Sequence, residues 1–387
     1  MSGVSRRSVL ASGAAGAAGL AGGALWSPRD QTPRDQTPQN ASAPPAAGIV
    51  ASTGAQQAGI TRPALAQAHL LFAVWTLTEL SSAAPTISKL GGLIEQLASA
   101  AHPAVAAFGP GGLTVTVGVG PRVVRQVDPA LPGAAELPTF AREDLGSAVQ
   151  GDVSVQLCAD NPALATAAFA VLGALMATAG PLLWSQSGAR AGSRPDGVSR
   201  NLVGFLDGII VPRGSDQLDR AVWLSGPAAV AGGAIAVVRR IRLDVASLLS
   251  LPVEHQEQVI GRVRSTGVPL SGGAPGDDVD LNAKTASGTY LVPLDAHARR
   301  ANPIPLGLPL MLRRSYSYDN GPGDAGLMFI SFQRELRTFV ATQQRMDQGD
   351  ALMAYATGTA SGTYLILPGR SAGTNLGDSL FGSGGSR

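Results

Sequence analysis

Hydrophobic and polar positions along the chain predict buried strands in both halves of the sequence. Residues 113–119 place an apolar side chain at every second position, as expected of a strand with one buried face. Residues 70–75 and 327–332 are short apolar runs, which are typical of strands buried on both faces. Strand-like patterns recur in residues 153–157, 234–245 and 363–367.

Helical spacing of apolar residues occurs between these strands. Apolar side chains recur every three or four positions in residues 87–97, 164–175 and 336–340. Asn161 followed by Pro162 is a good start for the second of these helices, because asparagine caps a helix and proline fits its first turn. Strands and crossover helices thus occur in each half of the chain, which predicts duplicated α+β domains.

The N-terminus carries a different kind of pattern. Residues 5–10 read S-R-R-S-V-L, and a weakly apolar stretch rich in alanine and glycine continues to about Leu25. Adjacent arginines before a stretch of low hydrophobicity indicate a twin-arginine export signal; an ordinary secretory signal and a basic tail are the alternatives. The stretch is too short and too rich in glycine for a stable membrane span.

A low-complexity segment follows this signal. Residues 29–38 repeat the pentapeptide RDQTP, and proline, alanine, glutamine and serine then dominate to about residue 60. No apolar periodicity occurs there, so the segment is predicted to be a disordered linker. The folded chain is expected to begin near His69.

Composition narrows the classes of function. The 387 residues suit one large core or two packed domains, and only 14% of them are charged. A net charge of +2 gives no electrostatic footprint for nucleic acid. The single cysteine, Cys158, excludes a disulfide within the chain, a cysteine-based zinc site and a CxxCH haem attachment.

One carboxylate stands out in an apolar run. Residues 201–210 read NLVGFLDGII, so Asp207 lies in an apolar segment with Gly204 before it and Gly208 after it. An acid is rarely buried unless it is paired or used, and glycines let the backbone pass close to a flat or bulky group. The alternative is a turn in which Asp207 caps the next element.

Histidine and arginine supply the other candidate groups. His69, His102 and His255 are interpreted as structural or solvated, whereas His297 lies in a polar, cationic segment directly after the strand-like TYLVPL. Loop positions after strands commonly carry function. The later segment MLRRSYSY, residues 311–318, adds the adjacent arginines 313 and 314.

These groups suit peroxide chemistry on haem better than other familiar sites. The chain shows no Gly-rich phosphate loop and no HExxH pattern. A neutral imidazole holds haem iron from one side. A carboxylate on the other side can move the proton of hydrogen peroxide, and a fixed cation can stabilise the departing hydroxide.

Several segments resemble those of dye-decolourising peroxidases, specifically the exported, twin-arginine type. The resemblance runs from about residue 68 to residue 370 and is specific as a combination, although GxxDG by itself is weak. The matching segments are GFLDG, HARRANP, MLRRSYSY, GLMFISFQRELRTFVATQQRM and GTYLILPG. Two departures concern the neighbours of Asp207: Leu206 replaces the usual basic residue, and residues 209–212 replace the usual Thr-x-Asn-Pro. The closing segment also lacks the usual aromatic pair and second proline.

The resemblance implies a role for each matching residue. His297 would be the proximal iron ligand, Asp207 the distal acid–base group and Arg313 the distal cation that also contacts the haem. Gly204 and Gly208 would let the backbone pack near the porphyrin. The neighbouring arginine at position 314 is ranked below these five.

The resemblance also implies a fold, a cofactor and partners. We expect an α+β fold with two ferredoxin-like domains, antiparallel sheets and peripheral helices, and with haem in the C-terminal half. The expected divisions are signal and linker in 1–60, an N-terminal domain in 61–200 and a haem-binding domain in 201–387. The expected cofactor is one non-covalent haem b. The expected partners are hydrogen peroxide, aromatic reductants such as dyes and phenols, and the twin-arginine translocase, and the oligomeric state is left open.

Three functions remain open from the sequence alone. The first is an exported haem peroxidase that oxidises aromatic reductants in one-electron steps, which the intact Asp, Arg and His favour. The second is a haem-handling protein that releases iron from haem, and the third is an accessory partner of an exported oxidase. Cys158 is a rival axial ligand but is interpreted as a core residue. Four aromatic residues are candidate electron relays as well as packing residues: Trp223, Tyr316, Tyr318 and Tyr364.

Overall fold

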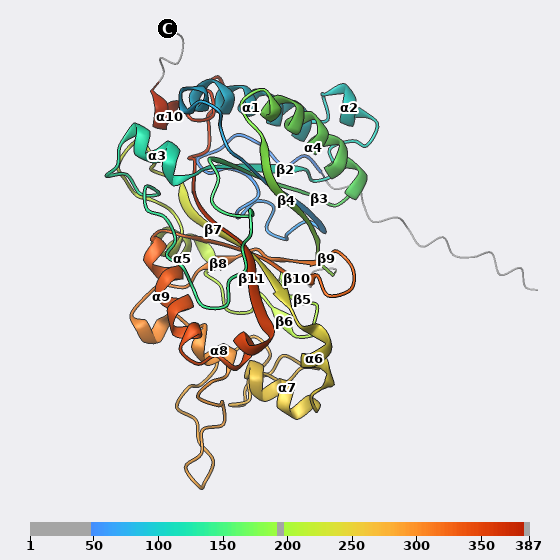
Figure 1. Ribbon diagram of the computed structural model, residues 1–387, viewed down its shortest axis with the longest axis vertical. Helices are drawn as coiled ribbons and strands as arrows, with labels where there is room; N and C mark the ends of the chain where they lie inside the picture. The colour runs from blue at the N-terminus through green and yellow to red at the C-terminus, as the bar shows by residue number, and fades with distance from the viewer. Residues whose placement is uncertain (1–47, 192–196, 383–387) are drawn as a thin grey trace, which may run out of the picture. The chain divides into compact units, whose positions relative to one another are not determined.

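The computed structural model describes residues 48–191 and 197–382, so the twin-arginine segment at residues 5–10 lies outside the described residues. The strands are β1 (His69–Trp75), β2 (Thr114–Val119), β3 (Val153–Ala159), β4 (Leu182–Ala189), β5 (Ser199–Arg200), β6 (Leu206–Asp207), β7 (Ala234–Leu243), β8 (Leu312–Arg313), β9 (Tyr316–Asp319), β10 (Ala325–Gln333) and β11 (Ala356–Ile366). Figure 1 shows how they are arranged.

Helices connect and cover these strands. The α-helices are α1 (Ala83–Ala98), α2 (Pro103–Ala106), α3 (Pro121–Val127), α4 (Pro162–Ala177), α5 (Gly214–Ala221), α6 (Val245–Ser250), α7 (Val253–Ile260), α8 (His297–Arg300), α9 (Leu336–Asp347) and α10 (Asp378–Phe381). Short 3-10 helices are η1 (Leu80–Ser82), η2 (Ile304–Leu306) and η3 (Ala351–Tyr355). The strands and helices expected from the six strand patterns and the three helical patterns are all confirmed. Asn161 caps α4, as expected, by accepting hydrogen bonds from the backbone N–H groups of residues 163 and 164, an arrangement worth about 1 kcal/mol.

The strands form two antiparallel four-stranded groups that meet at both edges. The N-terminal group has the order β2-β3-β1-β4, and the C-terminal group has the order β11-β7-β10-β9, with β8 beside β10. Short pairings of β11 with β2 and of β4 with β9 join the two groups into a closed ring of strands. The fold is therefore α+β with antiparallel sheets.

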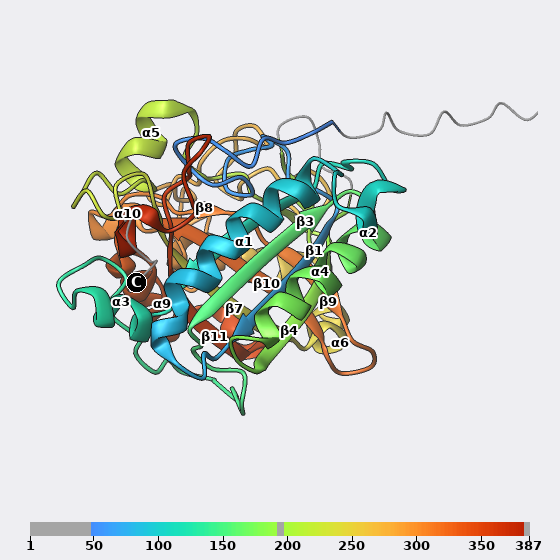
Figure 2. The same cartoon turned by 90° about the horizontal axis from the view of Figure 1, so that it is seen from above.

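Two large hydrophobic cores fill this architecture. One lies between the outer face of the N-terminal strands and helices α1 and α4, and the alternating side chains of residues 113–119 enter it as expected. Figure 2 shows α1 and α4 running across these strands. The second core fills the interior of the ring, which we call the barrel interior, and it contains Cys158 together with Trp184 and Tyr364.

The outer face of the C-terminal strands is covered differently. Alternate side chains of β7 and β10 point toward α9 and α8 rather than into the barrel interior, and Val237 packs there with Phe339 of α9. The cover is incomplete, so a cavity remains between the sheet and these helices. The fold thus brings the segments that carry Asp207, His297 and Arg313 together at this cavity.

Two expectations about the chain are wrong. Residues 48–60, the end of the predicted linker, pack on the fold: Ile60 is 1% exposed, and the Gln57 side chain bonds the backbone of Val117 and Leu367. The polar composition gave no indication of this packing, because hydrogen bonds hold the segment in place and its sequence has no apolar periodicity. Residues 289–294 do not form a strand; only an isolated bridge joins Lys284 to Tyr290, at the base of a turn.

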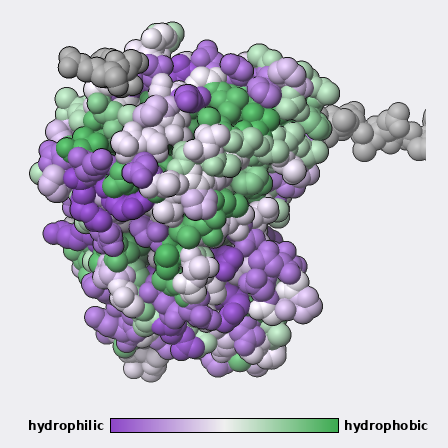
Figure 3. Space-filling view, turned by 45° about the horizontal axis from the view of Figure 1, so that its top comes forward, coloured by the Kyte–Doolittle hydropathy of each residue, from purple (hydrophilic) through white to green (hydrophobic). Residues whose placement is uncertain are grey.

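The described helices and the surface can be examined for long apolar segments. No described helix is both long enough and apolar enough to span a bilayer. Figure 3 shows hydrophobic residues gathered in patches toward the top of that view and hydrophilic residues dominating below.

Candidate active site

A cavity of about 260 Å³ lies on the outer face of the C-terminal strands. Its walls come from β7, β10, α8, α9 and the loop around residues 201–210, and most of the side chains are apolar. Aliphatic and thioether groups such as Ile241, Leu327, Met311 and Met346 dominate, and few polar groups interrupt them. Such a lining suits a flat hydrophobic ligand that is fixed by a small number of polar contacts.

Asp207 reaches this cavity from the end of β6. Its Oδ1 accepts a hydrogen bond of 2.6 Å from the backbone N–H of Gly208, so the carboxylate also stabilises its own turn. Gly208 has φ +85°, a conformation that a side chain disfavours, and it lines the cavity itself. Asp207 therefore stabilises its own turn and faces the cavity, and it does not cap the next helix, α5, whose N-cap residue is Arg213.

Arg313 of β8 lies beside this carboxylate. Its Nη2 is 3.6 Å from Oδ1 of Asp207, and its Nη1 donates a hydrogen bond of 3.0 Å to the backbone oxygen of Ile210. About a quarter of the Arg313 side chain remains exposed to the cavity. The loop that carries Ile210 thus holds the Arg313 guanidinium next to the Asp207 carboxylate.

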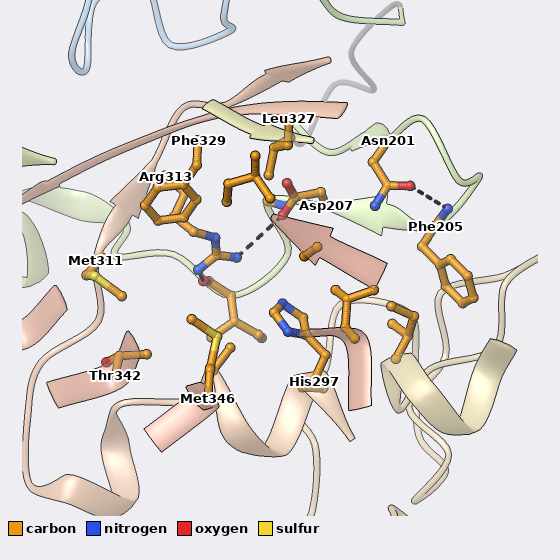
Figure 4. Close-up of a pocket in the computed structure, with 18 of the residues that line it drawn as sticks. Asn201, Phe205, Asp207, His297, Met311, Arg313, Leu327, Phe329, Thr342 and Met346 are labelled. Atoms are coloured by element: carbon orange, nitrogen blue, oxygen red, sulfur yellow. Dashed lines mark hydrogen bonds and ion pairs between the residues drawn. The ribbon is translucent and has the colours of Figure 1, made fainter. Parts of the chain in front are cut away.

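His297 faces the Asp207–Arg313 pair across the pocket in Figure 4. It starts the short helix α8 rather than following a strand, because residues 289–294 are irregular. Its Nδ1 is 2.7 Å from Oδ2 of Asp350, a carboxylate that is fully buried, whereas 34% of the His297 side chain is accessible. Nε2 is therefore the ring nitrogen left to bind a metal.

Electrostatics favour a basic imidazole at this position. Burial lowers the pKa of His297, but the charge of Asp350 and its hydrogen bond outweigh burial and leave the pKa above its usual value. Arg313 opposes this increase and Asp207 supports it, which places both residues within electrostatic range of the ring. A carboxylate behind a ligating histidine orients the ring and strengthens it as a donor.

The residues of the cavity fit a haem group. Among the residues that the structure describes, no cluster of three or more His, Cys, Asp or Glu side chains could hold a bare metal ion. A lone imidazole instead suits an iron whose equatorial positions are filled by a macrocycle. Arg239 lines the cavity with Nε and Nη1 buried and without hydrogen-bond partners among the described residues, so these donors suit an acidic group of a ligand.

Other residues singled out from the sequence lie away from the cavity. Gly204, at φ +88°, is absent from the described lining, and a Cβ there would meet Nε of Arg264 at 2.9 Å. The Arg314 guanidinium points into the protein and donates to the backbone oxygen of Ile60. Cys158 is buried in the barrel interior, which contradicts an axial role toward this cavity.

The candidate aromatic relays are also packing residues. All four rings lie in the barrel interior, with no more than 8% of each residue exposed. The members of this set are Trp223, Tyr316, Tyr318 and Tyr364. None of them belongs to the described lining of the cavity.

Sequence reasoning missed two acids that act behind the site. Asp350 follows α9, 53 residues after His297, with no motif that links the two. Glu143 comes from the N-terminal half, and its Oε1 lies 2.5 Å from Nη2 of Arg239 in a buried ion pair. The loop of residues 137–150, which carries Glu143, also pairs with Gly358 of β11. The only feature of the sequence that could have pointed to Asp350 is that this carboxylate follows a glycine just after the end of a helix.

Two family models match the chain. Residues 57–188 match the model described as Dyp-type peroxidase, N-terminal, and residues 198–371 match the model described as Dyp-type peroxidase, C-terminal. Together they cover most of the chain and include every residue of the cavity named above. The chain therefore belongs to the Dyp-type peroxidase family and is an enzyme, a haem peroxidase.

Two kinds of curated relative are similar to this chain. A dye-decolorizing peroxidase from Thermobifida fusca (strain YX) is 37% identical over 293 residues, which is 70% of this chain and 68% of that protein. A deferrochelatase from Yersinia pestis is 33% identical over 286 residues, which is 67% of this chain. The match spans 64% of the deferrochelatase, which is less than two thirds of its length.

Solved structures agree with the family. A DyP-type peroxidase from Streptomyces coelicolor superimposes with a TM-score of 0.81 at 31% identity, over 87% of this chain and 97% of that one. DtpA from Streptomyces lividans, in an oxyferrous complex, gives a TM-score of 0.80 at 32% identity, over 87% and 98% of the two chains. Family membership and these neighbours imply a haem iron cofactor.

Proposed function

We propose that this enzyme uses hydrogen peroxide to oxidise aromatic reductants, such as dyes and phenols, in one-electron steps. One haem b, held without a covalent bond, would occupy the cavity beside His297. When bound, it supplies the iron at which peroxide is reduced and at which the oxidising equivalents are stored.

Three side chains carry the proposed chemistry. His297 would hold the iron through Nε2, while Asp350 bonds Nδ1 and keeps the ring oriented. Asp207 accepts a proton from one oxygen of hydrogen peroxide and returns it to the other. Arg313 offers only donors, so it stabilises the negative charge that develops on the leaving oxygen but cannot accept the proton.

The observation that carries the proposal is the position of Asp207 beside Arg313, across the cavity from His297 (Figure 4). Haem carriage alone requires a ligand on one side only. An acid–base group and a fixed cation on the opposite side are what peroxide cleavage requires. Nε and Nη1 of Arg239, which have no hydrogen-bond partner among the described residues, add donors for a carboxylate of the cofactor.

The absorption spectrum of the purified protein tests this proposal. We expect a Soret band that changes rapidly on addition of one equivalent of hydrogen peroxide and returns when a phenol is added. Release of iron from haem, the activity named for the deferrochelatase relatives, is the second candidate. Bleaching of the Soret band with iron captured by a chelator, and no recovery with phenol, would favour that candidate.

The fold supports a finer division of the chain. Each four-stranded group has its first and third strands at the centre and its fourth beside the first, which is the order of a ferredoxin-like domain. We therefore propose two ferredoxin-like domains, in 61–200 and 201–387, with haem in the second. The separate family matches to 57–188 and 198–371 support a division between the two domains near residue 200.

Export is the remaining part of the proposal. The S-R-R-S-V-L segment at residues 5–10 and the apolar stretch after it support translocation by the twin-arginine route. That route would place the enzyme outside the cytoplasm: extracellular, at the cell surface or in the periplasm.

A further inference from the structure

Glu143 and Arg239 form a buried ion pair beside the cavity, although 96 residues separate them in the sequence. Arg239 lies on β7 and lines the cavity, whereas Glu143 comes from the part of the chain that matches the N-terminal family model. Only 3% of the Arg239 side chain and 8% of the Glu143 side chain are accessible. Removal of one partner from such a pair leaves a buried charge without compensation. The state of a cavity residue thus depends on one side chain of the N-terminal half.

Backbone contacts hold the loop of residues 137–150 against the C-terminal half. The N–H of Asp144 donates to the backbone oxygen of Gly358 at 2.8 Å, and the N–H of Gly358 donates to that of Arg142 at 2.9 Å. The N–H of Ala141 donates to Oδ2 of Asp347, on α9, at 3.1 Å. These bonds fix the backbone on both sides of position 143, so they determine where its carboxylate lies.

The two side chains of the pair are also held individually. Oε2 of Glu143 accepts a hydrogen bond of 3.0 Å from the backbone N–H of Phe140, which leaves Oε1 for Nη2 of Arg239. Cζ of Arg239 lies 4.9 Å from the centre of the Phe140 ring, within the range of a cation–π contact. A Cβ at Gly358 would lie 2.5 Å from Nη2 of Arg239, so a side chain there would displace the guanidinium. The guanidinium is therefore held in one orientation.

Two donors of this guanidinium remain for a ligand. Nε and Nη1 of Arg239 are buried and have no hydrogen-bond partner among the described residues. Burial lowers the pKa of Arg239, and the charges of Glu143 and Asp347 oppose this effect. Arginine stays protonated in proteins, so both donors belong to a cation. A carboxylate matches such charged donors well, and haem b carries two carboxylates.

Glu143 contributes orientation to this anchor rather than attraction. Its negative charge repels a second carboxylate, so a gain in cofactor binding must come from holding the Arg239 guanidinium in place. A free arginine side chain loses rotamer freedom when it binds a ligand, whereas a side chain that is already fixed does not incur this loss.

We propose that Glu143 is a positioning residue for the cofactor: it holds Arg239 so that Nε and Nη1 bind one carboxylate of haem; this inference rests on the proposed function. Glu143 itself lies outside the described lining of the cavity, so it acts through Arg239. The loop of residues 137–150 thereby makes retention of haem in the C-terminal half depend on the N-terminal half.

Haem dissociation from the purified holoenzyme tests this inference. The protein is loaded with haem b, and transfer of haem to an excess of apomyoglobin is followed through the Soret band. Glu143→Ala should release haem about 10-fold faster than the wild type, because Arg239 loses its charged hydrogen-bond partner. Glu143→Gln should release it at nearly the wild-type rate, since the amide oxygen can still accept from Nη2. Glu136→Ala, which removes an acid from an exposed ion pair with Arg125, is the control and should not change the rate.

The dimethyl ester of haem separates positioning from a general loosening of the structure. Both carboxylates are blocked in this ester, so Arg239 has no carboxylate to bind. Wild type and Glu143→Ala should therefore release the ester at the same rate. The double variant Glu143→Leu/Arg239→Leu replaces the buried pair by apolar side chains, a change that proteins tolerate better than removal of one partner. It should release haem b faster than the wild type and the ester at the wild-type rate, even if Glu143→Ala does not fold.

The outcomes separate this inference from the function on which it rests. A wild type that binds no haem overturns the proposed function and this inference with it. With a wild type that binds haem and responds to peroxide, release of haem b from Glu143→Ala at the wild-type rate overturns this inference alone. Equal acceleration of the release of haem b and of its ester also overturns it, because the loop would then only close the cavity.

Discussion

The imidazole of His297 and the carboxylate of Asp350 meet at 2.7 Å across 53 residues of sequence. His297 begins α8, and Asp350 caps η3 by accepting a hydrogen bond from the backbone N–H of Leu352. One buried acid therefore fixes the candidate iron ligand and the segment that leads into β11. The cavity wall and the ligand are positioned by the same contact.

Replacement of His297 by alanine should remove most haem from the purified protein while leaving it folded. The pocket is built by the sheet and α9, so loss of one axial ligand should not unfold it. The measurement is the ratio of Soret to protein absorbance, with circular dichroism as a check on folding. His255→Ala, at an exposed position of α7, is the control and should keep its haem. Full haem content and an unchanged Soret band in His297→Ala would exclude this ligand.

Asp350→Asn should keep haem but weaken the chemistry. The amide oxygen can still accept from Nδ1, but the negative charge that strengthens the imidazole is lost. Peroxidase activity should fall about 10- to 100-fold, the usual effect of removing such a partner. The reduction potential of the iron, measured by redox titration, should rise because the axial donor is weaker. Asp219→Asn, on exposed α5, should change neither quantity; an unchanged potential in Asp350→Asn would contradict the assigned role.

Much of this arrangement could be predicted from the sequence, since strands such as β2 and helices such as α4 follow periodicity. The residue types of the site also carried a signal, because Asp207, Arg313 and His297 lie in short motifs. Asp350 could not be found in this way, because its link to His297 exists only after two distant segments pack. The packing of residues 48–60 was missed for a similar reason: Gln57 bonds distant backbone groups and leaves no local pattern.

Stability at alkaline pH should report the surroundings of Tyr318. In the unfolded chain this phenol ionises near its ordinary pKa of 10, whereas in the folded protein burial raises the pKa to about 12. The contribution of the neutral Tyr318 phenol to the free energy of unfolding is therefore intact below about pH 10. It is lost between about pH 10 and 12, and the loss reaches about 3 kcal/mol. Urea unfolding at pH 8 and pH 11 should show wild type losing more stability than Tyr318→Phe. A difference between the two proteins that does not change with pH would contradict this environment.

Export should depend on the adjacent arginines at the N-terminus. Replacement of both Arg6 and Arg7 by lysine keeps the charge but removes the twin-arginine pair, so folded, haem-loaded protein should accumulate in the cytoplasm. Immunoblots of cytoplasmic and exported fractions provide the measurement, and Arg29→Lys, in the segment after the signal, is the matched control. Normal amounts of the double variant in the exported fraction would remove the twin-arginine assignment.

The most direct test of the proposed site is stopped-flow mixing of holoenzyme with hydrogen peroxide, followed through the Soret band. Asp207→Asn should react about 10²-fold more slowly than the wild type or worse, because its amide cannot accept the proton of the peroxide. Arg313→Leu should also react more slowly, because the fixed cation that stabilises the departing oxygen is lost. If Asp207→Asn reacts at the wild-type rate, another group is the base and Asp207 only stabilises its turn.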